Sequence, residues 1–263
     1  MPEPIKASWC LSDNFGDKLT PWLIKKITGR YPLYLEPGIQ DDPKLLGAGS
    51  ILNWNWAKNP KLIVWGSGIA AQTDSIEMSD FRLVRGPICS ERIKQLYKID
   101  IPFGDPGLLL SRFINKNVTQ TDEIGIIPHY ADQLIIWKRI ASKPKLRFIN
   151  ILNDIEDVVS SVRSCKFIFS SSLHGLILAD CYHIPNYWIK VSNNLLGDDT
   201  KFRDYFLSVN RNFDCIDCRD QRIPYDDVSK FTEFYNIRNP IDKIEARKEI
   251  IWNTCPFVDG ILK

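Results

Sequence analysis

The second half of the chain alternates short apolar runs with segments of helical periodicity. Short apolar runs bounded by turn residues indicate buried strands, and apolar residues spaced three and four apart indicate helices. The predicted strands cover 123–128, 146–152, 166–172 and 186–191, and the predicted helices cover 131–141, 154–165, 173–183 and 198–210. This repeated βαβ order favours a parallel sheet that helices cover on both faces.

The first half repeats the pattern less regularly. Strand-like stretches at 5–10, 44–52, 61–69 and 81–87 run into glycine-bearing turns, and helices are predicted at 20–30 and 87–98. The polar stretch 111–123 is the best linker candidate. We therefore predict an α/β protein with two Rossmann-like domains that face a cleft. The first covers residues 1–118 and is joined by a C-terminal helix at 240–263, and the second covers residues 119–239.

Composition narrows the class of protein. The 263 residues are 44% apolar and 11% aromatic, which supports a real core, and 34 basic residues nearly balance 32 acidic ones. Because the charges are mixed along the chain, a nucleic-acid partner is not favoured. No apolar run approaches the roughly 18 to 20 residues that span a bilayer, and the first residues lack a signal peptide. We expect a cytoplasmic protein, with contact to the inner face of the membrane left open.

The seven cysteines are odd in number, which suits reduced thiols better than a disulfide framework. Cys215 and Cys218 form a lone C-x-x-C, but no second pair or nearby histidine completes a zinc set. We therefore predict no metal site.

Turns that follow the predicted strands carry most of the candidate chemistry. In folds of this kind, ligands collect outside the carboxyl ends of the strands. Several of these turns are rich in glycine, which lets backbone amides approach an anion. Neither a dinucleotide fingerprint nor a Walker loop is present. The turns lie at 12–17, 47–52, 66–69, 85–87, 128–132, 170–175 and 190–194, and we expect them to face one crevice.

Two side chains in these turns suit anion binding and proton transfer. Arg85 ends a strand before a helix, and its planar guanidinium matches a carboxylate or a phosphate, although a surface ion pair would also explain it. His174 lies in the first turn of an apolar helix, where it could give a proton near neutral pH or merely pack against its own helix.

Other candidates carry weaker arguments. His129 ends a strand and allows the same chemistry as His174, whereas His183 is better explained as a helix C-cap. Lys190 would point a cation at the crevice, but a solvated lysine is the simpler reading. Asn14 and Asp17 suit a turn as well as a sugar contact.

Two further sets of residues have simple structural interpretations. Asp105 is more readily a turn residue than a catalytic one. Lys201, Arg203 and Asp204 are interpreted as a solvated helix face.

The ordered set of turns resembles the polysaccharide pyruvyl transferase family over roughly residues 12 to 210. The matching segments are DNFGDKLTPWL, GAGSIL, VWGSGI, VRGP, GDPGLLL, IGIIPHYAD, SSSLHGLILADCYHIPNYW and KFRDYFLSV. The resemblance implies a fold similar to B-type glycosyltransferases. It also implies transfer of the enolpyruvyl unit of phosphoenolpyruvate to two hydroxyls of a sugar, in a polysaccharide or its lipid-linked precursor. Phosphoenolpyruvate and the saccharide would be the partners, with no cofactor and no metal.

The resemblance also implies roles for particular residues. His174 would be the acid that protonates the donor, and Arg85, Asp17 and His129 would complete the catalytic set. The donor-binding residues would be Arg85, Ser171, Ser172, Leu173, His174 and Lys190. The acceptor-binding residues would be Asn14, Asp17, Gly49, Ser67 and His129. Some members of the family carry arginine where this chain has Ser172, so another group must hold the anion there.

Two other functions remain open from the sequence. A B-type glycosyltransferase that uses a nucleotide sugar would have the same fold. A non-catalytic saccharide-binding protein would keep the cleft without turnover.

Overall fold

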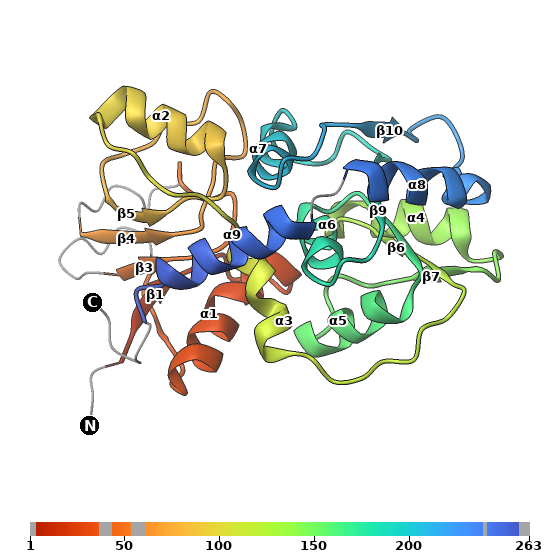
Figure 1. Ribbon diagram of the computed structural model, residues 1–263, viewed down its shortest axis with the longest axis horizontal. Coiled ribbons are helices and arrows are strands. Elements are labelled where there is room, and N and C mark those ends of the chain that lie inside the picture. The colour runs from red at the N-terminus through yellow and green to blue at the C-terminus, as the bar shows by residue number, and fades with distance from the viewer. Residues whose placement is uncertain (1–3, 37–43, 54–60, 239–240, 258–263) are drawn as a thin grey trace.

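The computed structural model describes residues 4–36, 44–53, 61–238 and 241–257. Within these residues each half of the chain forms its own parallel sheet with helices packed around it (Figure 1). The predicted α/β class with two Rossmann-like units is therefore confirmed.

The first sheet has the strand order β2-β1-β3-β4-β5, and all of its pairings are parallel. Its strands are β1 (Lys6–Ser8), β2 (Leu33–Tyr34), β3 (Lys44–Leu46), β4 (Leu62–Trp65) and β5 (Asp80–Leu83). Three of them lie inside predicted strands, and β5 begins one residue before the strand predicted at 81–87. The sequence did not indicate β2, because this edge strand has two residues and no apolar run.

The second sheet has the strand order β10-β9-β8-β6-β7, again with all pairings parallel. Its strands are β6 (Ile124–Ile127), β7 (Leu146–Phe148), β8 (Phe167–Ser170), β9 (Asn186–Lys190) and β10 (Cys215–Asp217). Counted along the chain within each half, both sheets run second, first, third, fourth, fifth. In a sheet of this order, ligands bind beyond the first and third strands, where the connections diverge.

The helices confirm most of the predicted periodicity. The first half has α1 (Phe15–Thr28), α2 (Pro87–Tyr97), η2 (Pro106–Leu109) and α3 (Leu110–Phe113). The second half has η3 (Tyr130–Asp132), α4 (Gln133–Ile140), α5 (Ile155–Ser164), α6 (Leu173–Cys181), α7 (Thr200–Ser208), η4 (Tyr225–Asp227) and α8 (Val228–Arg238). The last helix is α9 (Ile241–Asn253).

Helix α1 begins earlier than predicted. The prediction placed its start at Thr20 because proline favours a first turn, but Pro21 lies inside the helix and Asn14 is its N-cap. Phe15, Leu19 and Leu23 are all buried, and their packing outweighs the hydrogen bond that Pro21 cannot donate.

One hydrophobic core runs through both halves. Every residue of α6 is buried, and this helix packs on η2 of the first half. Helix α9 also contacts η2 and crosses between the two sheets (Figure 1), and the indole of Trp65 donates to the carbonyl of Ile251 at 3.2 Å. Residues 239–240 and 258–263, which belong to the predicted C-terminal helix or its start, lie outside the described residues. The domain boundary at 118–119 stays a prediction.

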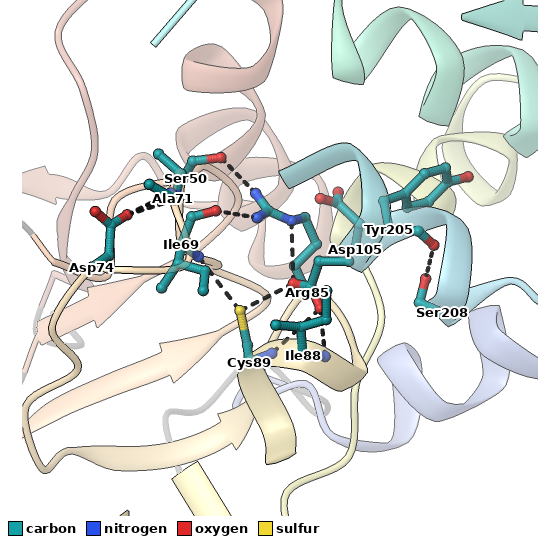
Figure 2. A network of polar contacts seen from close by, with 12 residues as sticks. Ser50, Ile69, Ala71, Asp74, Arg85, Ile88, Cys89, Asp105, Tyr205 and Ser208 are labelled. Carbon is teal, nitrogen blue, oxygen red and sulfur yellow. Dashed lines mark hydrogen bonds and ion pairs between the residues drawn. The ribbon is translucent and has the colours of Figure 1, made fainter. Parts of the chain in front are cut away.

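Asp204 on α7 joins the second half to the first. Its carboxylate accepts hydrogen bonds from the backbone amides of Ile88 at 2.8 Å and Cys89 at 3.3 Å, and from the thiol of Cys89 at 3.0 Å (Figure 2). Those amides belong to the first turn of α2. Amides in the first turn of a helix have no hydrogen-bond acceptor within their own helix. Gly86 permits this approach, because a Cβ there would lie 2.2 Å from the Asp204 carbonyl oxygen.

The same carboxylate faces the guanidinium of Arg85. The Nε of Arg85 lies 3.7 Å from an Asp204 oxygen, and neither side chain is exposed. Arg85 also donates to the Ser50 hydroxyl at 2.6 Å and to the Ile69 carbonyl (Figure 2). Burial raises the pKa of Asp204 and Arg85 opposes that rise. The interpretation of Asp204 as part of a solvated helix face is therefore wrong.

Removing one partner of this buried pair should be costly. We expect Asp204→Ala to lower the free energy of unfolding by about 3 to 5 kcal/mol, because it leaves Arg85 buried without its ion-pair partner and the α2 amides without an acceptor. Denaturant unfolding followed by circular dichroism measures this loss.

Two further variants serve as controls for that experiment. Leu207→Ala, at an exposed position on the same helix, should change the unfolding free energy by less than about 1 kcal/mol. The double variant Arg85→Met/Asp204→Leu should recover part of the loss, since no unpaired charge remains. An Asp204→Ala protein as stable as the Leu207→Ala protein would contradict the assignment.

Candidate active site

A cavity of about 170 Å³ lies where the carboxyl ends of the two sheets meet. The first half lines it with the turns after β1, β3 and β4, and the second half with the turns after β6 and β8 and with the segment from β9 into α7. The lining residues are Cys10, Asn14, Asp17, Gly49, Ser50, Ile51, Ala70, His129, Tyr130, Ser172, Leu173, His174, Leu196 and Lys201. Both switch points therefore open into one pocket, as the strand order predicts.

His174 reaches across the pocket from α6 to the first half. Its ring packs against Gly16 at the start of α1, where a Cβ would lie 2.1 Å from the His174 Nδ1 atom. Gly16 is thus a contact point between the halves, whereas the sequence suggested only a turn. Only 9% of His174 is exposed, and burial lowers its pKa to about 4 although Asp17 opposes the shift. The imidazole is neutral at pH 7 without a ligand.

Asp105 lies behind His174. One carboxylate oxygen caps η2 by accepting from the Gly107 amide at 2.9 Å. The other lies 4.0 Å from the Nε2 atom of His174, and both of these buried atoms lack a hydrogen-bond partner. Burial raises the pKa of Asp105 to about 6. The expectation of a turn residue is correct, but Asp105 is also placed to hold a proton on the Nε2 side of His174.

His129 lies on the second-half wall of the pocket. Its Nδ1 atom accepts from the Ala131 amide at 3.3 Å, so the neutral ring carries its proton on Nε2. The His129 amide donates to the Ser171 hydroxyl at 3.0 Å, and that hydroxyl donates to Asp132 at 2.7 Å. Burial and the nearby Lys201 lower the pKa of His129 to about 4.

Asp17 and Asn14 line the first-half wall. The Asp17 carboxylate accepts from the Ser12 hydroxyl at 2.5 Å and from the Asn14 side-chain amide at 3.3 Å. Asp17 is half-buried and raises the pKa of the His174 ring. A carboxylate oxygen with spare lone pairs in a pocket can accept a proton or orient a hydroxyl.

Lys201 is the charged pocket residue that the sequence interpretation missed. It lies in the first turn of α7 and donates to the Leu196 carbonyl at 3.1 Å. Burial, followed by repulsion from Arg85, lowers its pKa to about 8, so it remains largely protonated at pH 7. Its position at the start of the helix that follows β9 was the available signal, because the same rule located the other turns.

Four predicted residues lie outside this pocket. Arg85 and Ser67 are fully buried. Ser67 donates to the Gly47 carbonyl, and Arg85 supports the wall through Ser50. Lys190 pairs with Asp199 at 2.7 Å and, with Ser171, lines a neighbouring cavity of about 250 Å³. Direct donor contacts of Arg85, Lys190 and Ser171, and an acceptor contact of Ser67, therefore stay predictions.

Neither a metal cluster nor a membrane-spanning helix is found in the described part of the chain. No three histidine, cysteine or acidic side chains there are grouped to hold a metal ion. No helix there is both long and apolar enough to cross a bilayer. Cys215 is exposed and Cys218 is buried, and both are free thiols.

Sequence comparison decides the family. The profile of the family described as polysaccharide pyruvyl transferase matches residues 17–193, which contain all the pocket motifs from Asp17 to His174. The chain belongs to the polysaccharide pyruvyl transferase family. The resemblance stated from the sequence is confirmed, and so is the prediction of a pyruvyl transferase at the level of the family.

Two relatives of this pyruvyl transferase family member are known by sequence. An uncharacterised protein, L143, of Acanthamoeba polyphaga mimivirus is 32% identical over 206 residues, which cover 74% of this chain and 70% of that protein. The succinoglycan biosynthesis protein ExoV of Rhizobium meliloti is 26% identical over 224 residues, which cover 80% of this chain and 65% of ExoV.

A crystal structure of a protein of uncharacterised function from Klebsiella pneumoniae is similar with a TM-score of 0.49. That structure is 13% identical, and the match covers 77% of this chain and 87% of the other.

Burial of the two pocket histidines predicts a pH effect. Both have an ordinary pKa of 6.5 and a folded-state pKa of about 4, so between these values only the unfolded chain binds the protons. They therefore make the fold less stable as pH falls through this window.

Nuclear magnetic resonance of the imidazole rings checks this directly. Two of the three histidines should remain neutral until the pH approaches 4, and His129→Gln and His174→Gln assign their signals. His183, at the surface beside Glu245, provides the third signal as a comparison. Protonation of His174 near pH 6.5 in the folded protein would show that its ring is solvated.

Proposed function

We propose that this protein transfers the enolpyruvyl group of phosphoenolpyruvate to two hydroxyls of one sugar and releases phosphate. The observation that carries the proposal is the position of His174. A buried histidine, backed by Asp105, lies between a lysine of the second half and a carboxylate of the first. The acceptor is a saccharide of a polysaccharide or its precursor, in keeping with the family and with the printed name of ExoV.

The reaction balances without a redox step or a cofactor. An acid protonates the methylene carbon of the donor, and the neighbouring carbon gains oxocarbenium character. One sugar hydroxyl attacks that carbon, the bond to phosphate breaks, and the second hydroxyl closes the ketal ring. Of the two protons that leave the hydroxyls, one returns to the acid and one leaves with phosphate. Phosphoenolpyruvate is therefore a substrate, and no cofactor takes part in the proposal.

His174 is the acid in this proposal, although its pKa of about 4 leaves it neutral in the empty pocket. A donor that brings a phosphate and a carboxylate beside the ring would favour the charged imidazolium. With Asp105 holding one proton at Nε2, the transferable proton would lie on Nδ1. Donor binding and protonation of His174 are therefore coupled, so that His174 would carry the transferable proton only when the donor is bound.

Lys201 and the start of α6 provide the positive charge for the donor. Ser172 is the N-cap of α6, and Leu173 and His174 are the first residues of this helix at the pocket, where the backbone amides of the first turn favour an anion. Lys201 lies on the facing wall and brings the cation that Ser172 does not provide. Phosphate and carboxylate on the donor would then raise the pKa of Lys201 from its depressed value of about 8.

The acceptor would approach from the first half, as in B-type glycosyltransferases. Asn14, Asp17 and Gly49 line that wall. Because Nδ1 of His129 already accepts a hydrogen bond, His129 would donate from Nε2 and orient the sugar. Asp17 would then accept the proton of the attacking hydroxyl. Asp17 is therefore the proposed base, and His129 is the proposed sugar-orienting group.

Turnover with defined acceptors tests the function. Incubation with phosphoenolpyruvate and galactose-, mannose- or glucosamine-type acceptors should release phosphate and add the mass of a pyruvate ketal to one of these sugars. Stabilisation against heat by nucleotide sugars, with no effect of phosphoenolpyruvate, would instead favour the glycosyltransferase. Acceptor binding with no product from any donor would favour the non-catalytic protein.

Two substitutions divide the roles within the same assay. His174→Gln should lower kcat by at least about a hundredfold, since it removes the acid. Lys201→Met should raise KM for phosphoenolpyruvate by about tenfold and leave KM for the acceptor nearly unchanged, because a charged hydrogen bond to the donor is lost. Arg203→Ala, exposed on the same helix, is the control and should match the wild type. Equal effects of Lys201→Met on both KM values would reject a donor-specific role.

A further inference from the structure

A basic and apolar face surrounds α4, on the outer side of the second half (Figure 1). Residues 133–149 contain Lys138, Arg139, Lys143, Lys145 and Arg147 and no acidic residue. The whole chain has a net charge of only +2, so the remaining residues are net negative. Positive charge is thus concentrated at this one segment.

Three of these cations are unpaired. Arg139 donates to the carbonyls of Cys218 and Arg219, and Arg147 pairs with Glu123 at 3.3 Å. Lys138, Lys143 and Lys145 are exposed, and no acidic partner is recorded for them among the described residues. Their charge is therefore available to a ligand outside the chain.

Large apolar side chains are exposed beside Lys138 on α4. Leu134 is 65% exposed and Trp137 is 53% exposed. They lie three residues apart on α4 and share one side of the helix with Lys138. Trp137 packs edge-on against Phe148 of β7, with ring centroids 5.5 Å apart, which fixes its direction. We call Leu134, Trp137, Lys138, Lys143 and Lys145 the α4 face.

The chemistry of the α4 face fits the surface of an anionic bilayer. Tryptophan and leucine enter the boundary between headgroups and acyl chains, while lysine heads remain at the level of the lipid phosphates. A second copy of this face would bring lysines against lysines, which disfavours self-association. A nucleic-acid partner is also disfavoured, because the exposed side chains of Leu134 and Trp137 would add nothing to a contact with phosphates.

We propose that the α4 face docks this protein on membranes that contain anionic lipids. Tyr130, the first residue of η3 just before α4, is 49% exposed and lines the active-site pocket. Contact of Leu134, in the first turn of α4, with the bilayer would therefore bring the pocket mouth close to the membrane, whereas Lys143 and Lys145 follow the far end of the helix. This consequence rests on the proposed function, because it would present the site to a saccharide carried on a lipid. The lipid contact itself does not depend on that function.

Vesicle flotation of the full chain tests the contact. The protein should float with vesicles of phosphatidylcholine and phosphatidylglycerol, and much less with vesicles of phosphatidylcholine alone. Raising the salt concentration should release it, because screening weakens the lysine contacts. Absence of binding to the anionic vesicles at low salt would overturn the proposal.

Matched variants distinguish binding through the α4 face from binding through the overall charge of the protein. Lys138→Gln/Lys143→Gln/Lys145→Gln should weaken binding about a hundredfold, whereas Lys94→Gln/Lys98→Gln/Lys243→Gln makes the same charge change elsewhere and should bind nearly as the wild type. Leu134→Glu should also lose binding, whereas Leu96→Glu, at a similarly exposed leucine of α2, should keep much more of it. Circular dichroism confirms that each variant is folded.

Two other outcomes would also overturn the proposal. One is equal loss of binding in the α4 face variants and in their controls. The other is that the protein does not bind vesicles but forms a dimer, and that Leu134→Glu dissociates this dimer. Since flotation needs neither donor nor acceptor, retained binding in a protein without pyruvyl transfer would reject the proposed function alone.

Discussion

The carboxylate of Asp204 holds four groups of the first half at once. It accepts from two amides at the start of α2, accepts from the Cys89 thiol, and faces the guanidinium of Arg85. Because all of these groups are buried, water cannot replace the carboxylate, and the second half is fixed relative to the first. The site depends on this fixation. Lys201 is on the same helix as Asp204, and His174 meets Gly16 across the same junction.

A pocket made in this way is poised for an anion. His129 and His174 are held neutral by burial, Lys201 has a lowered pKa, and the charge of Arg85 is already balanced behind the wall. Each depressed pKa means that the empty site disfavours its own positive charge. A ligand with several negative charges reverses that penalty, so binding and protonation reinforce each other. This coupling would let a buried histidine act as an acid at neutral pH, as the proposed function requires.

Much of this arrangement could be predicted from local patterns. Short apolar runs located most strands, and the rule that ligands gather beyond strand ends brought Asn14, Gly49, His129, Ser172 and His174 to one pocket. These predictions succeeded because each depends on a few neighbouring residues. The edge strand β2 escaped because it has almost no pattern of its own.

Contacts between distant segments could not be predicted in the same way. From the sequence, Asp204 and Lys201 were interpreted as a solvated helix face. In the structure α7 packs on α2, which lies more than a hundred residues earlier in the chain. Arg85 looked available to a ligand because its partners Ser50, Ile69 and Asp204 come from three separate segments. Gly16 was interpreted as a turn residue, since nothing near it in the sequence reveals the His174 ring.

The most direct test of the central claim is a crystal structure of the protein with phosphoenolpyruvate bound. The account predicts the donor between the first turn of α6 and Lys201, with its methylene carbon next to the His174 ring and its phosphate or carboxylate bonded to Lys201. A donor held by Lys190 in the neighbouring cavity, with His174 and Lys201 free of contact, would contradict it.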